Sequence, residues 1–117
     1  MGMYIAIADG VGWATSSGVF DCIVEGTRIY LEGTDRACLR RIYRSLDEEA
    51  QNFIVLKSVE VECFNKFYFC CKKAMLDFSG SNAAHEIPSD HLEGILWNWD
   101  EVLKLMRHDP RYRMGEY

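Results

Sequence analysis

An alternation of apolar and polar residues between positions 20 and 32 constrains the fold more than any other local pattern in this chain. The apolar positions of this alternation are Phe20, Cys22, Val24, Ile29 and Leu31. Polar residues lie between most of them, and Glu25-Gly26-Thr27 has the composition of a turn. Alternation of this kind gives a strand one buried face and one solvated face. The pattern therefore predicts a β-hairpin over residues 20–32.

Two other segments repeat apolar residues every three or four positions, which is the period of an amphipathic α-helix. The first helix is predicted over 35–53, after a cap at Thr34 or Asp35, with a kink or restart near Ser45. Its apolar positions are Leu39, Ile42, Tyr43, Leu46, Ala50 and Phe53. The second helix is predicted over 89–107. Its apolar positions are Leu92, Ile95, Leu96, Trp99, Val102, Leu103 and Met106.

The remaining segments are shorter or ambiguous. Residues 3–8 form a brief apolar run that predicts a strand, and residues 53–63 alternate in the same strand-like way. Residues 64–78 fit both periods, but the aromatic residues at 67–69 favour a strand paired with the preceding one. Residues 79–88 are rich in turn-forming residues and predict a loop.

These elements predict one domain over residues 1–117, because a second core would need more chain than 117 residues supply. The expected fold class is α+β, with a mostly antiparallel sheet and two main helical segments packed on one face. The N-terminal strand, the hairpin and the 54–78 region would form the sheet. The polar segment 111–117 is expected to be a loose tail.

The charge of the chain restricts its partners. A formal net charge of −5 and a pI near 5.1 argue against nucleic-acid binding, which depends on Lys and Arg, and favour a basic protein partner. The sequence has no apolar run long enough to span a membrane and no secretion signal, so we expect a cytoplasmic protein. Its five cysteines form an odd set without repeated spacing, which predicts that all five are reduced.

No motif for a catalytic, cofactor or metal site is found in the sequence, so we expect none of these sites. The glycines after Asp9 match only the start of a dinucleotide-binding fingerprint, because Thr15 occupies the third glycine position. His85, His91 and His108 lack the close pairing typical of zinc ligands. A basic helix face would suit phosphate groups, which leaves RNA binding as a minor alternative. Its residues are Arg36, Arg40, Arg41 and Arg44.

The candidate partner-binding residues are two tryptophans and a set of carboxylates on expected solvated faces. On a continuous helix, Trp97 and Trp99 point about 200° apart, so both cannot face the core. An exposed tryptophan is a common anchor in protein interfaces. The carboxylates are Asp47, Glu48, Glu49, Glu60, Glu62, Asp100 and Glu101.

In size, acidity, aromatic content and lack of catalytic motifs, the chain resembles the bacterial immunity and antitoxin proteins. These proteins neutralise basic toxins, often nucleases, by docking on them, and the resemblance implies a non-enzymatic inhibitor of a toxin domain. One alternative is a small enzyme or ligand-binding domain whose site assembles from scattered residues such as Asp9, Cys70 and His85. Another alternative is a structural or adaptor subunit.

Overall fold

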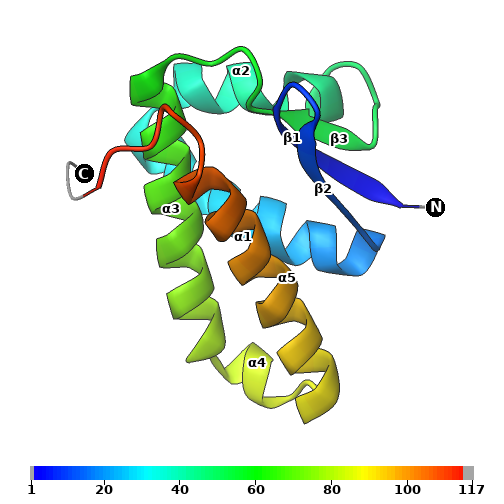
Figure 1. Ribbon diagram of the computed structural model, residues 1–117. Helices are drawn as coiled ribbons and strands as arrows, with labels where there is room; N and C mark the ends of the chain where they lie inside the picture. Colours follow the sequence, from blue (N-terminus) through cyan, green and yellow to red (C-terminus); the bar gives the residue numbers. More distant parts are fainter. Residues whose placement is uncertain (1, 115–117) are drawn as a thin grey trace.

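The computed structural model describes residues 2–114, within which three strands and five helices form one sheet and a layer of helices (Figure 1). The strands are β1 (Met3–Ala8), β2 (Val11–Thr15) and β3 (Phe53–Val55). The helices are α1 (Ser17–Thr34), α2 (Arg36–Asp47), α3 (Val61–Ser79), α4 (Asn82–His85) and α5 (Ser89–Arg107). The predicted α+β class is confirmed.

The sheet has the order β2-β1-β3 and is mixed, which corrects the prediction of a mostly antiparallel sheet. β1 and β2 form an antiparallel hairpin around a turn in which Gly10 has a φ of 71°, a left-handed conformation that glycine adopts without strain. β3 pairs with β1 in parallel, because two helices carry the chain back before β3 begins. Ile5, Ile7 and Ile54 are fully buried on the face that meets the helices.

The hairpin predicted over residues 20–32 is wrong, because this segment lies inside α1. Ser16 caps the helix by accepting a hydrogen bond from the Val19 amide at 3.4 Å. The buried residues of α1 are Phe20, Ile23, Val24, Thr27 and Leu31. Their spacing of three or four residues is helical, and the apolar Ile23 between Cys22 and Val24 is the departure from strict alternation that indicates it.

Gly26, expected to form the turn of that hairpin, instead lets three helices approach one another. A Cβ atom at this position would lie 3.2 Å from the ring of Trp99 on α5 and 3.8 Å from Ala74 on α3. Buried polar groups near this crossing are satisfied within the core. The Trp99 Nε1 group donates to the Cys71 carbonyl at 3.1 Å, and the Tyr43 hydroxyl donates to the Val24 carbonyl at 2.6 Å.

The strands predicted over 53–63 and 64–78 are also largely wrong. Only residues 53–55 form a strand, and residues 61–79 form the long helix α3. Of the two periods that residues 64–78 fit, the helical one is correct, since α3 buries side chains on most of its circumference between α1 and α5. A helix enclosed in this way carries apolar residues on several faces, which hides its period in the sequence.

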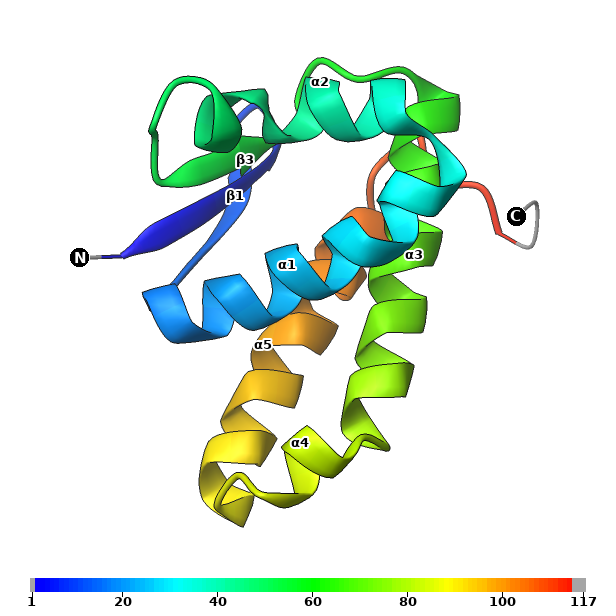
Figure 2. The same ribbon diagram turned by 180° about the vertical axis from the view of Figure 1, so that it is seen from behind.

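The helices predicted over 35–53 and 89–107 are confirmed, although the first is shorter than expected. α2 ends at Asp47 without a restart near Ser45, and Ala50 beyond it has a φ of 52°. The predicted loop over 79–88 contains the single-turn helix α4. Figures 1 and 2 show α3 and α5 side by side, joined through α4, with α1 crossing them on one side.

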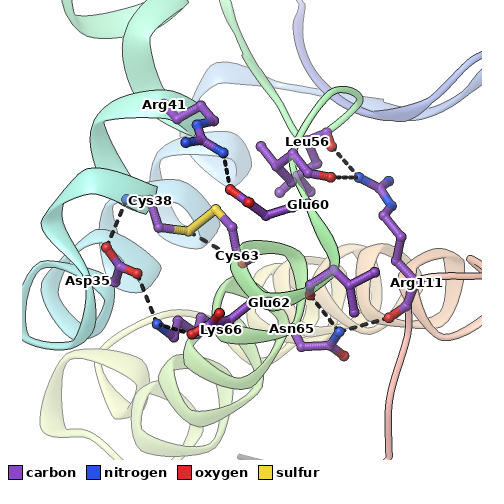
Figure 3. The surroundings of a disulfide bond; sticks show 12 residues. Asp35, Cys38, Arg41, Leu56, Glu60, Glu62, Cys63, Asn65, Lys66 and Arg111 are labelled. Carbon is purple, nitrogen blue, oxygen red and sulfur yellow. Dashed lines mark hydrogen bonds and ion pairs between the residues drawn. A yellow bond between two sulfur atoms is a disulfide. The ribbon is translucent and has the colours of Figure 1, made fainter.

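Two of the five cysteines form a disulfide, so the prediction that all five are reduced is wrong for this pair. Cys38 in the first turn of α2 is joined to Cys63 in the first turn of α3 (Figure 3). Nothing in the spacing of these residues shows that the two helix ends meet, because the contact forms only in the tertiary structure. Cys22, Cys70 and Cys71 are free, and burial raises the pKa of Cys71 to about 11.

The chain after α5 returns to the core at Arg111. Its guanidinium group donates to the carbonyl oxygens of Leu56, Val59 and Ile7 at 2.6–2.9 Å, and it stacks on the Phe64 ring. Figure 3 shows the hydrogen bond from Arg111 to Leu56. The segment expected to be a loose tail thus begins with an anchored residue, and its last part, residues 115–117, lies outside the described residues. No helix within residues 2–114 is both long and apolar enough to cross a membrane.

Candidate partner-binding surface

The solvent-facing side of α5 carries three carboxylates around one exposed tryptophan. Asp90, Glu93, Trp97 and Asp100 are three or four residues apart, so they lie on one face of the helix, and all four are exposed. Trp97 is 58% exposed, whereas Trp99 on the opposite side is completely buried. The prediction that one of the two tryptophans is exposed is therefore confirmed, and Trp99 cannot contact a partner.

Residues of β2 hold the exposed tryptophan in place. The Trp13 ring contacts the Trp97 ring edge to face, with 5.6 Å between ring centroids and 61° between ring planes. Trp13 also donates its Nε1 hydrogen to Asn98 Oδ1 at 2.9 Å, and the Thr15 hydroxyl donates to the same oxygen at 3.3 Å. Asn98 in turn donates to the Gly94 carbonyl at 2.7 Å. A ring fixed before binding loses little conformational freedom on binding.

Trp13 and Asn98 were not identified from the sequence. They are 85 positions apart, and neither belongs to a motif that would connect a strand residue with a distant helix residue. Trp13 could have been selected as one of three tryptophans in the chain, but its contact with Trp97 required the tertiary structure.

Negative charge is concentrated in the part of the molecule that contains this face. Residues 1–27 and 80–103 contain eight of the 18 carboxylates and none of the 13 Lys and Arg residues. These carboxylates are Asp9, Asp21, Glu25, Glu86, Asp90, Glu93, Asp100 and Glu101. The two segments meet in space, because β2 and the start of α1 pack beside α5. The remaining segments contain more basic than acidic residues, so the net negative charge of the chain comes from these two segments, which we call its acidic side.

Most carboxylates on this side have no cationic partner within 4.0 Å in the part of the chain that the structure describes. The exceptions on α1 and the β1–β2 turn are Glu25, which pairs with Arg28, and Asp9, which pairs with Lys57. On α5, Glu101 lies 4.0 Å from Lys104. Asp90, Glu93 and Asp100 thus form no ion pair among the described residues, and all three are exposed to an outside partner.

The candidate carboxylates around α2 and the start of α3 have a different environment, since most are paired within the chain. Arg28 binds Asp47 through two hydrogen bonds of 2.7 and 2.8 Å and lowers the pKa of that carboxyl group. Glu49 lies 3.8 Å from Arg44, and Glu60 is paired with Arg41. The arginine face predicted on α2 is exposed, and two of its residues, Arg41 and Arg44, are paired with these acidic neighbours.

The same pairing continues beside the disulfide (Figure 3). Lys66 contacts Asp35 at 2.9 Å and Glu62 at 3.0 Å, and these hydrogen bonds raise the pKa of Lys66 to about 12. Glu48, the remaining candidate, is exposed at the end of α2 among the arginines. The nine candidate residues therefore fall into two separate groups, one on α5 and one around α2 and α3.

The scattered residues considered for an enzymatic site lie apart from one another. Asp9 lies in the β1–β2 turn and pairs with Lys57, which follows β3. This turn is at the opposite end of the molecule from α4, the helix that contains His85 (Figure 1). Cys70 is buried in α3 with its sulfur 3.7 Å from the Thr34 hydroxyl. Within residues 2–114, no cluster of three or more His, Cys, Asp or Glu side chains has a metal-binding arrangement.

Comparisons with known proteins found one similarity, and it is a similarity of fold. No family model matches the sequence, and no curated protein matches it. The structure is similar to one chain of a solved complex of the CdiA-CT toxin from Burkholderia pseudomallei E479 with its cognate CdiI immunity protein. The TM-score is 0.78 at 18% sequence identity, and the alignment covers 93% of this chain and 97% of that chain. At this identity the similarity shows a shared fold, and function has to be argued from the surface.

Proposed function

We propose that this chain is an immunity-type inhibitor that binds a toxin domain through the acidic face of α5. The proposal rests on the fold that this chain shares, over nearly its whole length, with one chain of a toxin–immunity complex. An inhibitor of this kind needs a complementary surface and no catalytic groups of its own. The acidic side of the molecule matches a basic partner, because opposite potentials speed the encounter of two proteins and orient them.

Of the candidate residues, Trp97 and Asp100 on α5 are better suited to this role than the carboxylates around α2 and α3. Carboxylates that are already paired with Arg or Lys contribute little net potential toward a partner, as at Asp47, Glu49 and Glu62. Asp100 has no such partner among the described residues and lies one helical turn from Trp97. An aromatic anchor with a polar rim around it is a common arrangement in protein interfaces.

The function is tested by capture followed by a growth assay. The chain is immobilised, its partner is captured from the source cells and identified by mass spectrometry, and the partner is then expressed in host cells. We expect the partner alone to arrest growth and the wild-type chain to restore it. A captured partner that leaves growth unaffected contradicts the proposal. Growth arrest caused by this chain alone would instead assign it to the toxin half of such a complex.

Variants then locate the interface. We expect Asp100→Lys to slow association with the captured partner, with a larger effect at low salt, and Trp97→Ala to weaken binding by about 2 kcal/mol or more. Glu48→Lys is the matched control, since Glu48 is also an exposed carboxylate but belongs to the other group. Binding that resists Asp100→Lys but is lost with Glu48→Lys would move the interface to α2.

A further inference from the structure

A shallow apolar groove lies between the start of α1 and the first turns of α5. Its volume is about 490 Å³, and most of the surface that lines it is apolar. Val19 of α1, Ile87 before α5 and Ile95 of α5 contribute partly buried aliphatic side chains. Asn98 also lines the groove, and because this residue holds Trp13, the groove adjoins the tryptophan pair.

Two glycines line the groove without a role in the packing of the chain itself. Gly18 lies in the first turn of α1 and Gly94 lies within α5, and a Cβ atom at either position would meet no other atom within 4 Å. Neither residue has a positive φ. Glycine lowers the stability of a helix relative to alanine, so its presence at Gly94 is unfavourable for the free protein. Its effect is to leave the groove open beside the α5 backbone.

The charge around the groove restricts what can occupy it. Asp90 is on the rim, and Glu86 and Glu93 lie on either side of it along the chain, all three exposed. No Lys or Arg occurs between residues 80 and 103. An apolar floor with an acidic rim matches an apolar side chain that is followed by a cationic one. The groove is open rather than enclosed, which is typical of contact with a protein loop and unlike the deep pockets of small ligands.

We propose that the groove between α1 and α5 receives a loop of the toxin, with one apolar side chain on Val19 and Ile95 and an adjacent Lys or Arg paired with Asp90. This inference rests on the proposed function, and it specifies which side chains of the partner would bind in the groove beside Trp97. The glycine at position 94 allows the loop to approach the α5 backbone. The groove thus selects for the shape of the loop, while the α5 carboxylates attract any basic surface.

The test is to fill the groove and measure both folding and binding. In Gly94→Leu the side chain occupies the groove, and we expect a melting temperature equal to or higher than wild type together with at least a tenfold loss of affinity for the captured partner. Gly33→Leu is the matched control, because Gly33 is also a helical glycine and a Cβ atom added there would meet no other atom within 4 Å. We expect this control to bind like wild type. Asp90→Lys should slow association at least severalfold.

The outcomes separate this inference from the proposed function. If Gly94→Leu binds as tightly as wild type while Trp97→Ala does not, the groove proposal is overturned and the inhibitor function stands. If the captured partner binds but does not arrest growth, the proposed inhibitor function is contradicted. The affinity of Gly94→Leu for that partner still tests the groove. A change of oligomeric state in Gly94→Leu, or the absence of any captured partner, also overturns the proposal.

Discussion

Ile42 offers a direct test of how α2 is placed in the fold. Its side chain is completely buried, and α2 packs against β3. The substitution Ile42→Asp removes the aliphatic side chain and puts a carboxyl group in its place. Ile29 on α1 provides a matched control, since it is 72% exposed and Ile29→Asp makes the same chemical change within another helix.

The expected cost follows from burial. Truncating a buried isoleucine costs about 2–5 kcal/mol, and a buried carboxyl group without a hydrogen-bond partner adds about 1–3 kcal/mol. The total, about 3–8 kcal/mol, is a large fraction of the stability of an ordinary domain, which is about 5–15 kcal/mol. The exposed substitution Ile29→Asp should cost less than about 1 kcal/mol, since it changes mainly helix propensity.

Urea unfolding followed by circular dichroism measures both variants. With a slope of about 1–3 kcal/mol per molar urea, a loss of about 4 kcal/mol lowers the midpoint by roughly 1–4 M. If Ile42→Asp does not fold, Ile42→Val keeps the test quantitative, with an expected cost of about 0.5–1.5 kcal/mol. Equal midpoints for Ile42→Asp and Ile29→Asp would refute the placement of α2 against the sheet.

Three further measurements test other parts of the structure. The disulfide between Cys38 and Cys63 closes a loop of 25 residues, and the loop-entropy account gives a stabilisation of about 3.5 kcal/mol. A reductant should therefore lower the urea midpoint of unfolding, and an unchanged midpoint would argue against the disulfide. Hydrogen bonds from Arg111 lower the pKa of Asp109 below its ordinary 3.8, so folded Asp109 binds fewer protons. Stability from this pair should be full above pH 3.8 and lost as the pH falls through the folded pKa, a dependence that Asp109→Asn should reduce. Acrylamide should quench Trp97 most strongly, so Trp97→Phe should remove the most accessible part of the fluorescence.

The sequence alone determined those features that depend on one residue and its near neighbours. The helices at 36–47 and 89–107 were predictable, because each has one apolar face and one polar face. The same reasoning placed Trp97 and Trp99 on opposite sides of α5. The acidity of the chain is also a property of composition, and composition by itself favours a basic partner.

The tertiary structure decided everything that depends on how elements meet. α1 and α3 are buried on several sides, so their apolar residues no longer follow one period, and local patterns favoured strands at both places. The parallel pairing of β3, the disulfide between Cys38 and Cys63, and the contact of Trp13 with Trp97 each join segments that are far apart in the chain. The fold also decides which carboxylates are paired and which are available to a partner, because pairing depends on which cation the fold brings near. Glu62, for example, is paired with Lys66.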